Sequence, residues 1–160
     1  YGGTAGKLKG HKFSLYDGGM REPGIMHWPG RIPGGKVLSE PCAAMDIFPT
    51  FLTAAGGDVS KYEVDGMDIL PYVADGEALP ERTIFWEMGK QTAVRRGKWK
   101  LVLDGQLVEG APPEDEVHLS NLVEDMGERV NLKDEDPELT AELKTMAETW
   151  RAGIEGRWER

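Results

Sequence analysis

The stretch around which this chain is organised reads K-L-K-G-H-K-F-S-L-Y-D-G-G-M-R-E-P-G-I-M-H-W-P-G-R-I and runs from Lys7 to Ile32. Frequent glycines in its first half predict a loop with left-handed turns and exclude a stable helix. Three lysines, Lys7, Lys9 and Lys12, lie on this loop. Backbone N–H groups that glycine leaves accessible can bind phosphate or sulfate together with an ammonium group. The loop is therefore a candidate anion site, and a solvated lysine loop without a ligand is the alternative that spacing alone leaves open.

The second half of the stretch predicts a buried strand. Gly24–Trp28 is a short apolar run, and a Pro-Gly turn closes it. His27 alternates with apolar residues there, so we interpret it as a hydrogen-bonded core histidine rather than a ligand. A further short strand is expected over Val37–Met45, with its proline at an edge or a bulge.

Composition excludes several function classes. The 160 residues carry a formal net charge of −9, which argues against nucleic acid because phosphate binding needs a basic face. No apolar run is long enough to span a bilayer, and no signal peptide opens the sequence. The sequence starts at Tyr1 without a methionine, so we expect the interior of a longer protein. Cys42 is the single cysteine, which rules out an internal disulfide and leaves the compartment open.

The middle of the chain predicts one helix followed by a connector. Asp46 is expected to cap a helix that has an apolar face and ends at Gly56-Gly57. The capping role accounts for Asp46 without a catalytic one. Residues 58–81 are polar and rich in turn formers, and the boundary between two structural units is expected near Leu79–Arg82.

After this boundary the pattern changes to short strands. Four strands in sequence, with a hairpin between the middle pair, favour an antiparallel sheet. The expected strands are Arg82–Met88, Thr92–Arg95, Lys98–Leu103 and Val117–Leu119, with the hairpin turn at Arg96-Gly97. On the third strand, alternation places Lys98 and Lys100 on the face opposite the apolar residues.

The last element is an amphipathic helix, which Asp136 caps and Pro137 begins. Six apolar residues recur on it at helical spacing: Leu139, Leu143, Met146, Trp150, Ile154 and Trp158. We expect this stripe to pack on one face of the small sheet. The fold class is therefore α/β plus α+β, with residues 1–80 in an α/β part and residues 81–160 in a small domain of antiparallel sheet plus helix.

Three motifs resemble one known family. L-K-G-H-K-x-S-L-Y-D-G-G-M-R-E-P, the W-P-G-R-I that follows and M-D-I-F-P-T further on are similar to the C-terminal part of type I sulfatases, in the alkaline-phosphatase-like superfamily. The likeness is greatest to the arylsulfatase A and N-acetylgalactosamine-6-sulfatase branches, and it weakens between Asp104 and Asp115. It implies that residues 1–80 are the end of an α/β/α catalytic domain carrying an active-site lysine loop.

The resemblance also implies roles for individual residues. Lys12 would be an active-site lysine that contacts the sulfate group, and His11 would help to bind substrate or orient its neighbours. Complete type I sulfatases use calcium and a formylglycine made from the first residue of a C/S-x-P-S/A-R motif. Cys42 lies in C-A-A-M-D, which does not match, and the family takes its calcium ligands from other segments. We therefore expect no metal site in this chain and no activity from the chain alone.

One departure and several alternatives remain. Met88 stands where many relatives have a histidine that reaches the substrate, which puts that contact in doubt. A related phosphoester or phosphonoester hydrolase is an alternative, as is a non-catalytic module that binds an anionic glycan or a protein. The expected partners are a sulfated small molecule or glycan, the N-terminal catalytic portion of the same protein and, for the isolated chain, a second copy. The resemblance implies a periplasmic, extracellular or lysosomal location.

Overall fold

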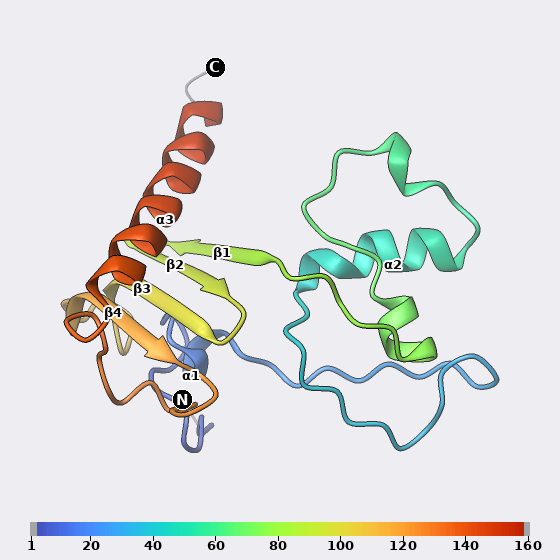
Figure 1. The fold of residues 1–160 in the computed structure, drawn as a ribbon, viewed down its shortest axis with the longest axis horizontal. Coiled ribbons are helices and arrows are strands. Elements are labelled where there is room, and N and C mark those ends of the chain that lie inside the picture. Colours follow the sequence, from blue (N-terminus) through green and yellow to red (C-terminus); the bar gives the residue numbers. More distant parts are fainter. Residues whose placement is uncertain (1–2, 159–160) are drawn as a thin grey trace. The chain divides into compact units, whose positions relative to one another are not determined.

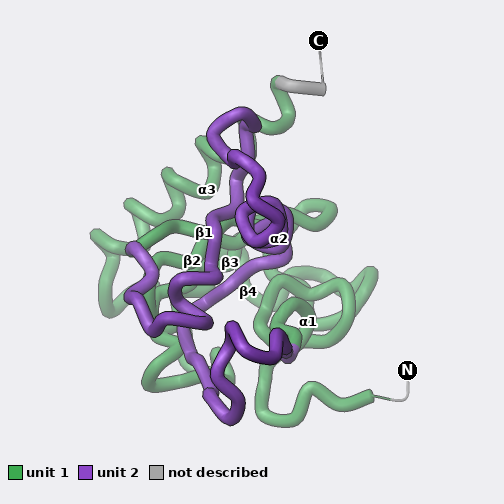
Figure 2. The backbone as a smooth tube through the Cα atoms, turned by 90° about the vertical axis from the view of Figure 1, so that its right-hand side faces the viewer, with its two compact units in different colours: residues 1–22, 81–160 green, residues 23–80 purple. Residues whose placement is uncertain are grey.

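A computed structural model describes residues 3–158 of the chain. Their contacts form two compact units, of which one joins the residues up to Glu22 to those from Glu81 onward and the other spans Pro23–Pro80 (Figure 2). The predicted boundary near Leu79–Arg82 coincides with the end of the second unit, whereas the lysine loop packs with the second half of the chain. The division of residues 1–80 and 81–160 between two domains of a larger enzyme stays a prediction.

The first unit is built on a four-stranded antiparallel sheet, as predicted. Its strands are β1 (Thr83–Met88), β2 (Gln91–Arg96), β3 (Trp99–Gly105) and β4 (Asp115–Asn121), in the order β1-β2-β3-β4 (Figure 1). Arg96 pairs with Trp99, so the hairpin turn is Gly97-Lys98, one residue later than predicted. Gly97 has a φ of 56°, which a glycine adopts without steric cost.

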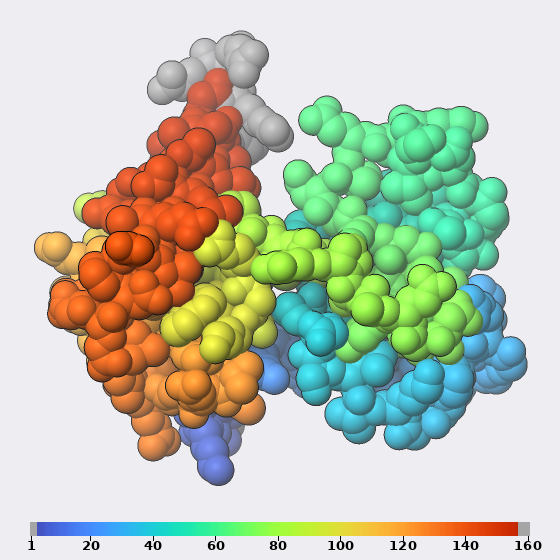
Figure 3. Space-filling model, viewed as in Figure 1, coloured from blue at the N-terminus to red at the C-terminus, as the bar shows by residue number. Residues whose placement is uncertain are grey.

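Helix α3 (Pro137–Trp158) covers one face of this sheet, as the space-filling view shows (Figure 3). Leu143 and Ala147 are fully buried against strand residues, and Trp150 stacks on Phe85 with ring centroids 5.2 Å apart. The Asp136 side chain caps the helix by accepting from the Leu139 N–H at 3.1 Å. The predicted stripe is thereby confirmed as core from Leu139 to Trp150, whereas Ile154 is half-buried outside the core cluster and the Trp158 side chain lies outside the described residues.

The opposite face of the sheet is covered by the lysine loop and by α1 (Asp17–Met20), a single short turn of helix. Leu15 and Tyr16 are buried there against Ala93 and Val102, which point away from α3. Successive residues of a strand face opposite sides, so the two layers use alternate positions of β2 and β3. This packing explains why the loop belongs to the unit that contains the sheet.

The second unit, Pro23–Pro80, differs from its prediction. It contains α2 (Ile47–Ala54), two 3₁₀ turns (Ala44–Asp46 and Val59–Lys61) and a π turn (Pro71–Asp75). The predicted strands Gly24–Trp28 and Val37–Met45 are wrong. Every strand in residues 3–158 belongs to the other unit, so neither run has a strand within Pro23–Pro80 to pair with.

Two residue assignments in this unit also need correction. His27 is exposed rather than a core histidine, and its neighbour Ile25 is 93% exposed. Asp46 does not cap α2 with its carboxylate. Its two oxygens instead accept from the Ala43 N–H at 2.7 Å and from the Met67 N–H at 3.0 Å, so this buried aspartate ties the start of α2 to a later turn.

Candidate functional site

The lysine loop is a compact turn with Lys12 at its tip. The Ser14 N–H donates to the His11 carbonyl at 2.9 Å, which closes the turn around Lys12 and Phe13. Phe13 has a φ of 73°, in the left-handed region that residues with a Cβ rarely occupy. Both Lys12 and His11 are exposed, and the Lys12 Nζ lies 5.0 Å from the centre of the Phe13 ring. The tip therefore presents a cation to solvent on an unusual backbone turn.

The three lysines of the loop differ in what surrounds them. Lys9 is engaged, because its Nζ lies 2.6 Å from a Glu114 oxygen and 4.4 Å from the centre of the Tyr16 ring. Lys7 and Lys12 have exposed side chains. Lys9 is thus a structural residue, and of the two exposed lysines it is Lys12 that lies at the tip of the turn and within the motif that carries the anion-binding hypothesis.

The paired glycines of the motif let α1 contact the loop backbone. A Cβ at Gly18 would collide with the carbonyls of Lys9 and Gly10, and a Cβ at Gly19 would collide with those of His11 and Ser14. The Gly18 N–H also donates to the Lys9 carbonyl at 2.7 Å. The D-G-G segment thereby holds the loop in a closed shape that a side chain at either position would prevent.

A buried charge cluster fixes the end of the loop to the sheet. The Lys100 Nζ lies 2.6 Å from Asp17 Oδ1 and 2.9 Å from Glu128 Oε1, and the Asp17 N–H donates to Glu128 Oε2 at 2.6 Å. All three residues are buried, and Arg21 adds a second cation 3.6 Å from Asp17. Burial raises the pKa of Glu128 above its ordinary value, while the Lys100 ammonium opposes that rise.

Tyr16 and His118 form a second buried polar contact under the loop. Their rings meet edge to face with centroids 5.3 Å apart, and His118 Nδ1 lies 2.7 Å from Asp115 Oδ2. Burial lowers the pKa of His118, and the Asp115 carboxylate works against that shift. Burial also raises the pKa of the Tyr16 hydroxyl, so both side chains stay neutral near neutral pH.

The remaining sites expected from the sequence are not brought together around Lys12. Met88 packs its side chain against the apolar cluster of Leu15 and Tyr16. Cys42 is exposed in the other unit. Within residues 3–158 no three His, Cys, Asp or Glu side chains gather as a metal site, so these residues do not by themselves fit calcium.

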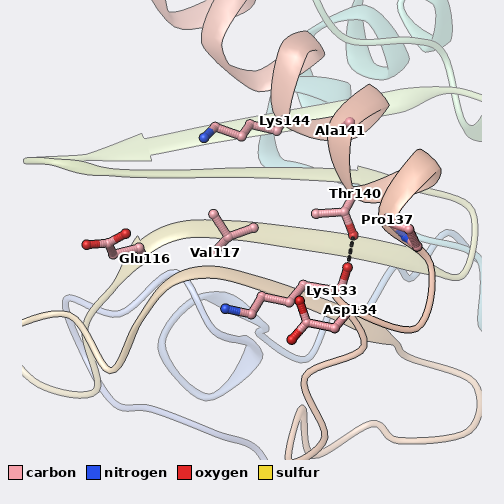
Figure 4. A pocket seen from close by; sticks show the side chains of 8 residues that line it. All are labelled: Glu116, Val117, Lys133, Asp134, Pro137, Thr140, Ala141 and Lys144. Atoms are coloured by element: carbon pink, nitrogen blue, oxygen red, sulfur yellow. Dashed lines mark hydrogen bonds between the residues drawn. The ribbon is translucent and has the colours of Figure 1, made fainter.

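A shallow hollow lies elsewhere, between the start of β4 and the start of α3 (Figure 4). It is lined by Lys133 and Lys144 but also by Glu116 and Asp134, and Thr140 donates to the Lys133 carbonyl at 3.2 Å beside it. Its mixed charges give no preference for an anion. The hollow therefore does not compete with the lysine loop as a candidate anion site.

Comparison with known proteins decides the family. The family model described as Sulfatase matches residues 1–57. Arylsulfatase A of Bos taurus is 31% identical over 162 residues, which cover 89% of this chain and 32% of that protein. The chain belongs to the sulfatase family. N-acetylgalactosamine-6-sulfatase of Canis lupus familiaris is 42% identical over 101 residues, covering 62% of this chain and 19% of that protein. The chain therefore spans about a third or less of the length of these sulfatases.

Solved structures agree with this assignment. The crystal structure of Ps i-CgsB superposes with a TM-score of 0.71 at 28% identity, over 89% of this chain and 31% of that one. A structure from work on glycosaminoglycan metabolism by Bacteroides thetaiotaomicron (BT33336S-sulf) has the same fold, with a TM-score of 0.70 at 22% identity over 92% of this chain and 32% of that one. The sulfatase resemblance and the sheet-plus-helix fold predicted from the sequence are thereby confirmed.

Proposed function

We propose that this chain is part of a sulfatase that hydrolyses sulfate esters of a sulfated sugar or an aryl alcohol, and that Lys12 binds the sulfate group. Two observations support the proposal. The chain has the sulfatase motif around Lys12, and the Lys12 side chain is exposed at the tip of a loop whose backbone is held from below. The second observation carries it, because a cation on a fixed backbone can meet an anionic group with little reorganisation.

The chemistry that Lys12 supplies is electrostatic. Attack on the sulfur of a sulfate ester increases negative charge on the sulfuryl oxygens and on the leaving oxygen. The Lys12 ammonium would donate a hydrogen bond to one sulfuryl oxygen and offset that charge, most effectively where water is excluded. His11, the neighbour of Lys12 at the tip, would contact the substrate beside it. His11 is positioned by its backbone, since its N–H donates to the Leu107 carbonyl at 2.9 Å.

The proposal assigns the other parts of the reaction to segments outside residues 3–158. In the complete enzyme, other segments would hold the calcium and carry the formylglycine, the two groups that supply the metal and the nucleophile of the reaction. Isolated chain would then be inactive, and its natural partner would be the N-terminal catalytic portion of the same protein. No helix in residues 3–158 is long and apolar enough to cross a membrane. A periplasmic, extracellular or lysosomal location follows from the family and is part of the proposal.

The experiment replaces Lys12 in the complete enzyme and measures turnover of a chromogenic aryl sulfate. We expect Lys12→Ala to lower kcat/KM on the order of 10²-fold or more, because it removes a donor to the transition-state charge. Lys7→Ala, on the same loop and also exposed, is the matched control and should leave turnover within a few-fold of the parent.

Three results would overturn the assignment. Turnover within a few-fold of the parent in Lys12→Ala would remove Lys12 from the sulfate site. Faster hydrolysis of the matching phosphate ester than of the sulfate ester by the parent enzyme would favour a phosphoester hydrolase instead. A glycan-binding module without activity would show binding of sulfated oligosaccharide that Lys12→Ala leaves unchanged.

A further inference from the structure

Gln91, the first residue of β2, makes the contacts between the sheet and the turn that carries Lys12. Its Nε2 donates to the Phe13 carbonyl at 2.8 Å, and its Oε1 accepts from the Leu15 N–H at 3.2 Å. The same oxygen accepts from the Gln106 N–H at 3.0 Å. Gln91 is only 2% exposed, and its bond with Leu15 is buried, whereas the bonds with Phe13 and Gln106 are partly buried.

These bonds flank a backbone conformation that is costly by itself. Phe13 has a φ of 73°, and a residue with a Cβ keeps this left-handed conformation only where its surroundings hold it. Gln91 binds the carbonyl of Phe13 and the N–H two residues later, which is the backbone on the C-terminal side of Lys12. Since the side chain of Lys12 leaves the backbone one residue before Phe13, within the same turn, its direction depends on the conformation of that turn.

The other side-chain contacts to the loop act farther from Lys12, and the nearer bond from the His11 N–H to the Leu107 carbonyl joins two backbone groups. The Lys100 cluster binds Asp17, and Lys9 binds Glu114. A carboxamide is suited to the nearer position because it can donate to a carbonyl and accept from an N–H at once, which neither a carboxylate nor an ammonium can do. Gln91 is therefore the sheet residue whose loss would change the turn at Lys12 most directly.

We propose that Gln91 is a positioning residue for Lys12: its carboxamide holds Phe13 in the left-handed conformation and so directs the Lys12 ammonium toward the sulfate group. This inference rests on the proposed function. It adds that activity depends on a residue of the small sheet that does not touch the substrate. Because a displacement of about 1 Å at a reacting centre can cost about 10²-fold in rate, the effect is measurable.

The test is a double-mutant cycle between Gln91 and Lys12 in the complete enzyme. Gln91→Leu removes all three side-chain bonds, and Gln91→Glu keeps the acceptor but loses the donor to the Phe13 carbonyl. We expect each to lower kcat about tenfold or more on an aryl sulfate. In a Lys12→Ala background we expect Gln91→Leu to have no further effect, since the group that it positions is absent.

Gln106→Leu is the matched control. In the part of the chain that the structure describes, Gln106 bonds to Gln91 through its backbone N–H and not through its side chain. Gln106→Leu therefore makes the same glutamine-to-leucine change as Gln91→Leu but keeps the hydrogen bond between the two residues. It should retain the parent kcat. Amide hydrogen exchange of the 160-residue chain supplies a readout without activity: exchange at Leu15 should rise in Gln91→Leu and not in Gln106→Leu, with both chains folded by circular dichroism.

The outcomes separate the two proposals. If Lys12→Ala keeps the parent rate, the proposed function fails, whatever Gln91 does. If Lys12→Ala loses activity while Gln91→Leu matches Gln106→Leu, Gln91 has no positioning role. Losses that multiply in the double variant would also overturn it, because they would show that Gln91 acts independently of Lys12. Faster exchange at Leu15 without a change in kcat would show a purely structural contact.

Discussion

The two faces of the small sheet are covered in different ways. Toward α3 the contacts are apolar, with Leu101, Leu119 and Leu143 fully buried. Toward the lysine loop the buried residues include Lys100 and His118, which are held by charged or polar partners. An apolar face tolerates small shifts between layers, whereas ion pairs and hydrogen bonds fix one register. The sheet thus has a wholly apolar core on one face, and on the other face an apolar cluster joined by polar contacts that define the position of a loop.

The largest expected loss of stability comes from a substitution on the polar face. Lys100→Met would leave the buried carboxylates of Asp17 and Glu128 without their ammonium. Removal of one partner from a buried ion pair costs about 3–5 kcal/mol. Urea unfolding of the chain should show that loss. Lys98→Met, at an exposed position of the same hairpin, should stay within about 0.5 kcal/mol of the parent. Equal stability of the two variants would contradict the role of the cluster.

On the apolar face, Leu143→Ala should destabilise the chain by about 2–5 kcal/mol, because it removes a fully buried side chain and leaves a cavity. The same unfolding measurement compares it with Thr149→Ala, at an exposed position of α3. The two substitutions should also differ in their effect on the lysine loop. Under native conditions we expect Lys100→Met to increase amide hydrogen exchange in the loop and Leu143→Ala to leave it unchanged.

The smallest expected effect is the pH dependence of stability that comes from His118, on the polar face. Burial lowers the pKa of His118 below its ordinary 6.5, so the unfolded chain binds a proton at a higher pH than the folded chain does. Its contribution to stability is full above about pH 6.5 and is lost as the pH falls toward the lower folded value. The free energy of unfolding should change by at most about 1.4 kcal/mol per pH unit through this histidine. His118→Gln should flatten this pH dependence, and His27→Gln, at an exposed histidine, should not.

The contacts on the apolar face could be predicted from the sequence, whereas the buried charges on the polar face could not. Helical spacing on α3 and alternation on β3 were enough to predict the apolar contacts. Alternation also placed Lys100 opposite them, but a lysine in that pattern ordinarily indicates a solvated face. Its burial depends on Asp17 and Glu128, which are far from it in the chain. No local pattern connects the three residues.

The candidate site shows the same limit. The motif around Lys12 and the glycines that follow it were visible from the sequence. Gln91 was not, because a glutamine at the start of a strand carries no signal until the backbone that it binds is known. The strands expected at Gly24–Trp28 and Val37–Met45 failed for a related reason: an apolar run forms a strand only where a neighbouring strand offers hydrogen bonds.

The close approach at Gly18 and Gly19 has a consequence for inherited variation. Every amino-acid replacement of a glycine adds at least a Cβ, and at both positions that atom would collide with backbone carbonyls, which have no alternative rotamer to adopt. Any missense change in either codon should therefore damage the loop, regardless of the chemistry of the new side chain. A screen of coding variants should therefore find these two codons depleted of substitutions.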